Sequence, residues 1–141
     1  MESISELIIK SGDMAVLIKE AQSIGKKVAA QNLTTNQIRN VFGEVRRIEM
    51  SWDDNRPQKA QEAFRDLVMI RPKLAYLVAR EAQTKGERKG EGVKTLKDTL
   101  DPCIEIIQGA PEDERKLYFD RFLAYFEAIL AYHRASGGRQ G

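Results

Sequence analysis

The sequence predicts an all-α protein, folded as a compact bundle of about five helices, on three observations. Apolar residues recur every three or four positions along almost the whole chain, which is the period of an amphipathic helix. Strict alternation of apolar and polar residues, which would indicate strands, is nearly absent. The 141 residues suffice for one domain with a substantial core.

The first predicted helix spans residues 13–30. Asp13 is a suitable N-cap, and Ser11-Gly12 separates this helix from residues 4–10, which we interpret as a short helix or a mobile arm. The residues expected on its buried face are Met14, Leu17, Ile18, Ala21, Ile24 and Val28.

The second predicted helix spans residues 35–50 and has a marked start. Thr34 and Gln37 stand three residues apart, which is the pattern of a capping box. Trp52 then begins a polar connection to Pro57, which suits the first position of the next helix. The apolar stripe of the second helix consists of Ile38, Val41, Phe42, Val45 and Ile48.

The third helical segment, residues 57–82, contains Pro72. Proline lacks a backbone N–H and crowds the preceding turn, so we expect a kink or break near Ile70 and Arg71. Residues 84–92 carry three glycines among charged residues and are predicted to form an exposed, flexible loop.

Two further helices complete the predicted bundle. One covers residues 93–107, with Pro102 kinking or dividing it, and the other covers residues 117–132, the most aromatic part of the chain. Acidic residues just before the last helix complement its positive end. We therefore expect a short helix or arm at 1–12, one helical domain at 13–136 and a flexible tail at 137–141.

Composition narrows the class of protein. The formal net charge is only +2, so any site for a polyanion must come from local clustering of basic residues. Cys103, the only cysteine, rules out an internal disulfide, and it lies in an apolar run typical of a packed thiol. The N-terminus resembles no secretory signal, and no apolar run could cross a membrane, so we expect a cytoplasmic protein.

A catalytic site is not predicted. His133 is the only histidine and has no identifiable nucleophile or carboxylate partner, so we interpret it as a structural or dipole-compensating residue. One histidine and one cysteine cannot form the usual metal site, and no cofactor-binding motif is present. We expect neither enzyme activity, nor a metal, nor a cofactor.

The second helix carries the first basic group. Arg39 and Arg46 are seven residues apart and point almost the same way, with Gly43 between them leaving the backbone open. Two guanidinium groups beside a bare patch suit a polyphosphate backbone. The alternative interpretation is an ordinary solvated helix flank.

The third segment carries the second basic group. Lys73, Tyr76 and Arg80 fall on one helix face, where a tyrosine can stack or hydrogen-bond while cations hold phosphates. The alternative is a tyrosine at the edge of the core beside two solvated bases. Arg65 lies slightly upstream. We expect the cations of the two helices to come together on one exposed surface.

Three segments in order resemble the CRISPR-associated Csm small subunit of type III-A effector complexes. They are residues 33–46, then residues 71–76 with Arg80, and finally residues 126–134, within a likeness that covers residues 15–138. The resemblance implies a non-catalytic helical subunit, present in several copies, in an RNA-guided antiviral complex. The loop after Thr84 and the N-terminal segment depart from the family pattern.

The resemblance also implies ligands and partners. The subunit would contact the backbone of guide RNA and target RNA without reading sequence, with single-stranded DNA as a further polyanion. Its protein partners would be other effector subunits and copies of itself, including a homodimer in isolation, and it would not bind a membrane. The expected RNA-binding residues are Arg39, Arg46, Lys73 and Arg80, with Tyr76 beside them and Arg47, Arg65 and Arg71 as weaker candidates.

A different class of function stays open on the residues alone. The same arginines could pair with acidic groups of a protein partner, which would make the chain a helical adaptor that touches no nucleic acid.

Overall fold

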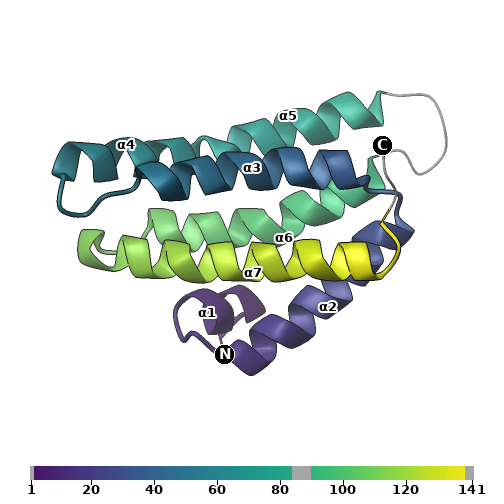
Figure 1. Ribbon diagram of the computed structural model, residues 1–141, viewed down its shortest axis with the longest axis horizontal. Helices are drawn as coiled ribbons and strands as arrows, with labels where there is room; N and C mark the ends of the chain where they lie inside the picture. The colour runs from purple at the N-terminus through teal and green to yellow at the C-terminus, as the bar shows by residue number, and fades with distance from the viewer. Residues whose placement is uncertain (1, 84–89, 139–141) are drawn as a thin grey trace.

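The computed structural model describes residues 2–83 and 90–138, and within them the fold is all-α, as predicted. Figure 1 shows long helices lying roughly side by side, with α7 between α3 above it and α2 below it. The elements are α1 (Ile4–Ile9), α2 (Met14–Ala30), α3 (Thr35–Ser51), α4 (Pro57–Val68), α5 (Ile70–Ala82), α6 (Glu91–Gln108), the 3-10 helix η1 (Glu112–Glu114) and α7 (Arg115–Ala135). No helix among these residues is long and apolar enough to cross a membrane.

The N-terminal segment forms the short helix α1. Ser3 and Glu6 make a capping box at its start, and Ile8 and Ile9 are buried in the core. Arg121 of α7 donates hydrogen bonds to the carbonyls of Ile9 and Lys10, at 3.0 and 2.9 Å. Burial and these bonds hold the segment against the bundle.

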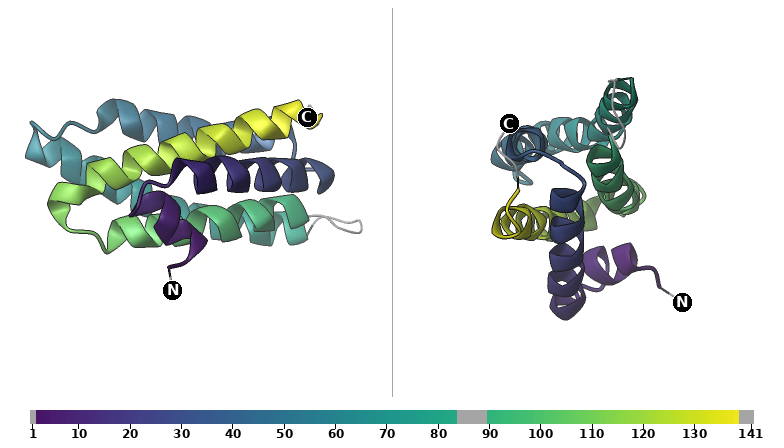
Figure 2. Two further views of the ribbon diagram at one scale, coloured as in Figure 1. Left: turned by 90° about the horizontal axis from the view of Figure 1, so that it is seen from below. Right: turned by 90° about the vertical axis from the view of Figure 1, so that its right-hand side faces the viewer.

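α2 begins as predicted and buries most of the predicted face, with two exceptions. The Asp13 carboxylate caps the helix by accepting from the N–H of Val16, and Leu17 and Val28 are buried. The prediction was wrong for Met14 and Ile18, whose side chains are 59% and 43% exposed. Figure 2 shows α2 beside α1 at the edge of the bundle.

α7 forms the centre of the core. It packs against α2, α3, α6 and α1, and Phe119, Phe122 and Phe126 are fully buried. Phe126 meets Phe42 of α3 edge to face at 5.2 Å between ring centroids. Trp52, predicted to begin a polar connection, is buried and stacks on Phe119 at 5.0 Å. The C-terminal half of the chain therefore supplies the surface on which α3 is fixed.

The predicted interruption of the third segment is present, but it lies at Met69, between α4 and α5. Pro72 follows in the first turn of α5, where its missing N–H leaves little unsatisfied. The carbonyl four residues before a proline is the one its ring crowds, so the break falls upstream of the proline itself. Pro57 begins α4, as predicted.

The predictions for α6, for the loop before it and for the C-terminal tail are met only in part or lie outside the described residues. Pro102 does not divide α6, which runs unbroken from Glu91 to Gln108. Of the predicted loop, residues 84–89 lie outside the described residues, as do residues 139–141 of the predicted tail. Gly138 donates from its N–H to the carbonyl of His133, and its own carbonyl accepts from Thr35 at 3.4 Å.

Candidate nucleic-acid interface

The orientation of α3 is fixed by its N-terminal cap and by its buried apolar face. The Thr34 hydroxyl accepts from the N–H of Gln37, and the Gln37 side chain accepts from the N–H of Thr34, so the predicted capping box is formed. Ile38 and Val45 are fully buried, which turns the opposite side of α3 toward solvent. The basic residues of α3 lie on that outward side.

Four residues define the outward face of α3: Arg39, Gly43, Arg46 and Arg47, all of them exposed. A methyl group added at Gly43 would meet nothing within 4 Å, so the helix backbone is open there. Within the described part of the chain, the side chains of Arg39 and Arg47 form no hydrogen bond or ion pair. Arg46 pairs with Glu49 at 2.7 Å, and both side chains are partly exposed.

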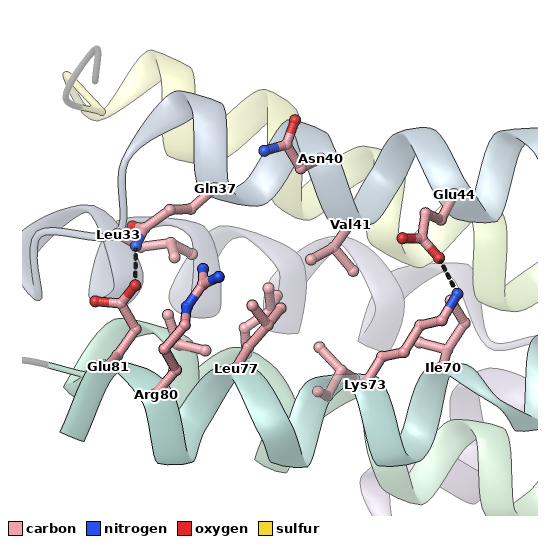
Figure 3. Close-up of a pocket in the computed structure, with 13 residues that line it drawn as sticks. Leu33, Gln37, Asn40, Val41, Glu44, Ile70, Lys73, Leu77, Arg80 and Glu81 are labelled. Atoms are coloured by element: carbon pink, nitrogen blue, oxygen red, sulfur yellow. Dashed lines mark hydrogen bonds and ion pairs between the residues drawn. The ribbon is translucent and has the colours of Figure 1, made fainter. Parts of the chain in front are cut away.

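A groove of about 170 Å³ lies between α3 and α5, over residues of α6 (Figure 3). Two polar interactions join α3 and α5 across the rim of this groove. Lys73 of α5 pairs with Glu44 of α3 at 2.9 Å, and Gln37 donates to Glu81 at 3.2 Å. Figure 3 shows the side chain of Arg80 between these two links. The apolar floor consists of Leu33, Val41, Ile70, Leu74, Leu77, Val93 and Leu96.

The structure brings together only part of the predicted set. Arg47 and Lys73 line one hollow beside Glu44, and Arg80 lies further along the same side of α5. Tyr76, 65% exposed, falls between Lys73 and Arg80 in helix register.

Arg39 and Arg46 do not join them in the groove. Arg46 is two residues from Glu44, or about 160° away around the helix axis, so it lies on the far side of α3 from α5. The predicted cations therefore lie on two sides of α3, Arg39 and Arg46 on one and Lys73 and Arg80 on the other, with Arg47 between them. Arg65 is exposed on α4, outside both groups.

Residues 11–139 match the family model for Csm2 Type III-A. The chain belongs to the Csm2 family. It is thus a subunit of a type III-A CRISPR effector complex, as the resemblance in the sequence implied. No curated protein and no solved structure matches this chain. The match covers α2 to α7, and therefore both basic groups, whereas α1 lies before it.

Arg71 of this Csm2-family chain joins two helices. Its guanidinium bonds Asp101 of α6 at 2.8 and 3.2 Å, with Gln108 at 2.8 Å and Glu105 at 3.5 Å completing the cluster. The hydrogen bonds that Arg71 donates to the Asp101 carboxylate raise the pKa of Arg71. The Arg71 side chain is 28% exposed, against 49% for Arg46 and 57% for Lys73, so we leave Arg71 out of the proposed interface.

We expect Arg71→Ala to lower the free energy of unfolding by about 1–3 kcal/mol, since Asp101 would lose its charge-assisted partner in a partly buried site. Urea denaturation measures this change. The same variant should keep the wild-type salt dependence of RNA binding. A flattened salt dependence at unchanged stability would instead place Arg71 among the RNA contacts.

His133 and Cys103 of this Csm2-family subunit are both buried in the core. His133 is fully buried, and its Nε2 lies 2.6 Å from the carbonyl oxygen of Leu33, which supports the structural interpretation. Burial raises the pKa of the Cys103 thiol to about 12, so the thiolate is scarce. Among residues 2–83 and 90–138, no cluster of three or more His, Cys, Asp or Glu could hold a metal ion.

Sequence reasoning missed the carboxylate partner of Lys73 and the second link across the groove. Glu44 lies beside Lys73, 29 residues away in sequence, and Gln37 meets Glu81 across 44 residues. The only local signal was helix register, which puts Gln37 and Glu44 seven residues apart on one side of α3. It could not reveal that α5 lies opposite.

Proposed function

We propose that this Csm2-family chain is a non-catalytic small subunit that binds the sugar–phosphate backbone of guide RNA and target RNA without sequence specificity. Several copies along one effector would add their weak contacts. The observation that carries the proposal is the outward face of α3, with three exposed arginines around the uncovered Gly43. Guanidinium groups bind phosphate oxygens well, and an open backbone allows close approach.

The α3–α5 groove supplies a second line of contacts. Lys73 and Glu44 are 57% and 37% exposed, so their ion pair contributes little to stability and Lys73 can transfer to a phosphate. Tyr76 is positioned to stack on a base, which any base permits. Arginine, lysine and an exposed ring, with no motif for reading base edges, suit a ligand of variable sequence.

The test is RNA binding by a quadruple variant, Arg39→Ala with Arg46→Ala, Lys73→Ala and Arg80→Ala. Each phosphate contact on a single strand contributes about −0.7 to the slope of log K against log salt. We therefore expect the variant to flatten the wild-type slope by about 2–3, with unchanged helicity. Fluorescence anisotropy on two unrelated RNAs at several salt concentrations measures the slope.

The matched control replaces Lys59, Lys94, Lys97 and Lys116 with alanine, which removes the same charge from other helices. This control should retain most of the wild-type slope, because the effect depends on place and not on net charge. If the wild type and the quadruple variant show equal slopes of log K against log salt, the proposed contacts are rejected. Absence of salt-sensitive RNA binding by the wild-type chain would favour the protein adaptor.

A further inference from the structure

α2 carries a basic face that the sequence interpretation passed over. Lys19, Lys26 and Lys27 are exposed, and within the described residues none of these side chains forms a hydrogen bond or ion pair. Lys19 and Lys26 are seven residues apart, so they share one side of the helix about 10 Å apart along its axis. Ser23 lies between them on the same side, and its hydroxyl can also bond a phosphate.

Glu20 is the single acidic residue of α2, and it is half-buried. It lies about 100° from Lys19 around the helix axis, on the side that carries Lys27, but it forms no ion pair with any of the three lysines. The outward side of α2 is therefore an unneutralised positive strip.

The strip differs from three of the cations predicted on α3 and α5. Arg46, Lys73 and Arg71 are bound to carboxylates of the chain itself. A phosphate must displace those carboxylates, whereas the three lysines are free to bind at once. Because its lysines are not paired with carboxylates, α2 can bind a polyanion without first breaking ion pairs, unlike Lys73 in the α3–α5 groove.

The position of α2 separates the two surfaces. α2 packs against α7 and α6, and α3 packs on α7 and α4. Figure 1 shows α3 above α7 and α2 below it, and the right-hand view of Figure 2 shows α2 beside α7. The two surfaces therefore lie on different helices, which pack on α7 at different places.

We propose that the outward face of α2, with Lys19, Lys26 and Lys27, is a second contact surface for a nucleic-acid backbone, so that one subunit holds two separate stretches of it. This inference rests on the proposed function, since it assigns a further surface to the same ligand. Lysine binds phosphate as a point charge and without base specificity, which suits a strand of any sequence.

Two measurements test the inference. In the first, anisotropy titrations compare the wild type with a variant carrying Lys19→Gln, Lys26→Gln and Lys27→Gln. We expect the slope of log K against log salt to flatten by about 2, with roughly tenfold or greater loss of affinity at 100 mM salt. The control variant with Lys59→Gln, Lys94→Gln and Lys116→Gln removes equal charge and should bind like the wild type.

In the second, the wild-type chain is acetylated with and without RNA, and the modified lysines are identified by mass spectrometry. We expect RNA to protect Lys19, Lys26 and Lys27 more than Lys59. Wild-type affinity in the α2 variant together with unprotected lysines would overturn the inference. A variant that binds RNA normally but no longer joins the other effector subunits would also overturn it, and would assign the strip to an acidic protein.

The outcomes separate this inference from the proposed function. If the quadruple variant of α3 and α5 loses RNA binding and the triple lysine variant of α2 does not, the α2 inference alone fails. If the triple lysine variant loses RNA binding and the quadruple variant does not, the α2 surface stands and the contacts proposed for α3 and α5 fail. If the wild-type chain binds no RNA, both fail.

Discussion

Phe126→Ala is expected to lower the free energy of unfolding by about 3–5 kcal/mol. Phe126 is fully buried, meets Phe42 of α3 at 5.2 Å and lies 6.3 Å from Phe122 between ring centroids. Its removal leaves a cavity between α3 and α7 that rigid neighbouring helices fill only in part. Urea denaturation monitored by circular dichroism at 222 nm measures the change.

The control for Phe126 is its neighbour Glu127, which is exposed on the same helix. Glu127→Ala should change the unfolding free energy by no more than about 0.5 kcal/mol. A loss below about 1 kcal/mol in Phe126→Ala would contradict the described packing of α3 on α7. Because α3 carries the arginines of the outward face, the variant should also weaken RNA binding at temperatures where it is partly unfolded.

Gly25→Ala is expected to destabilise the protein by about 1–3 kcal/mol. A methyl group at Gly25 would lie 2.6 Å from Cβ of Tyr132, 2.8 Å from the backbone N of His133 and 2.9 Å from the carbonyl O of Ile129. Two of these atoms belong to the backbone of α7, so α2 must move away from α7 as a unit. This cost exceeds the gain of about 1 kcal/mol that alanine brings to a helix interior.

Gly43→Ala is the matched control, because Gly43 also lies inside a helix and has nothing within 4 Å of the added methyl group. This variant should gain about 0.5–1 kcal/mol. Thermal unfolding should therefore show a lower Tm for Gly25→Ala and a higher Tm for Gly43→Ala. Shifts of the same sign would contradict the close approach of α2 to α7.

Local chemistry allowed much of the fold to be predicted from the sequence. Asp13, Thr34 and Pro57 mark helix starts because a side-chain acceptor or a fixed φ angle acts within one turn. The exposed faces of Met14 and Ile18 were not predictable in this way. Helical periodicity tells which residues share a face, but only the packing of whole helices decides how far that face is covered.

The candidate site was predictable to a smaller extent, for a related reason. Arg39, Gly43 and Arg46 share one side of α3 as helix register requires. Whether they meet Lys73 depends on the angle at which α5 lies beside α3, which no short motif contains. The bonds of Arg71 to Asp101 likewise join residues 30 positions apart, so they follow from the tertiary fold alone.

If a strand docks in the groove as proposed, the pairing of Lys73 with Glu44 makes that step an exchange of one anion for another. A phosphate that takes the lysine leaves Glu44 behind as a neighbouring negative charge, which favours early departure of the strand. A single subunit should accordingly dissociate from RNA quickly. A row of subunits on one strand should stay bound, because a lost contact re-forms before the neighbouring contacts dissociate. Carboxylates beside the groove would thus keep unassembled subunits from remaining bound to unrelated RNA.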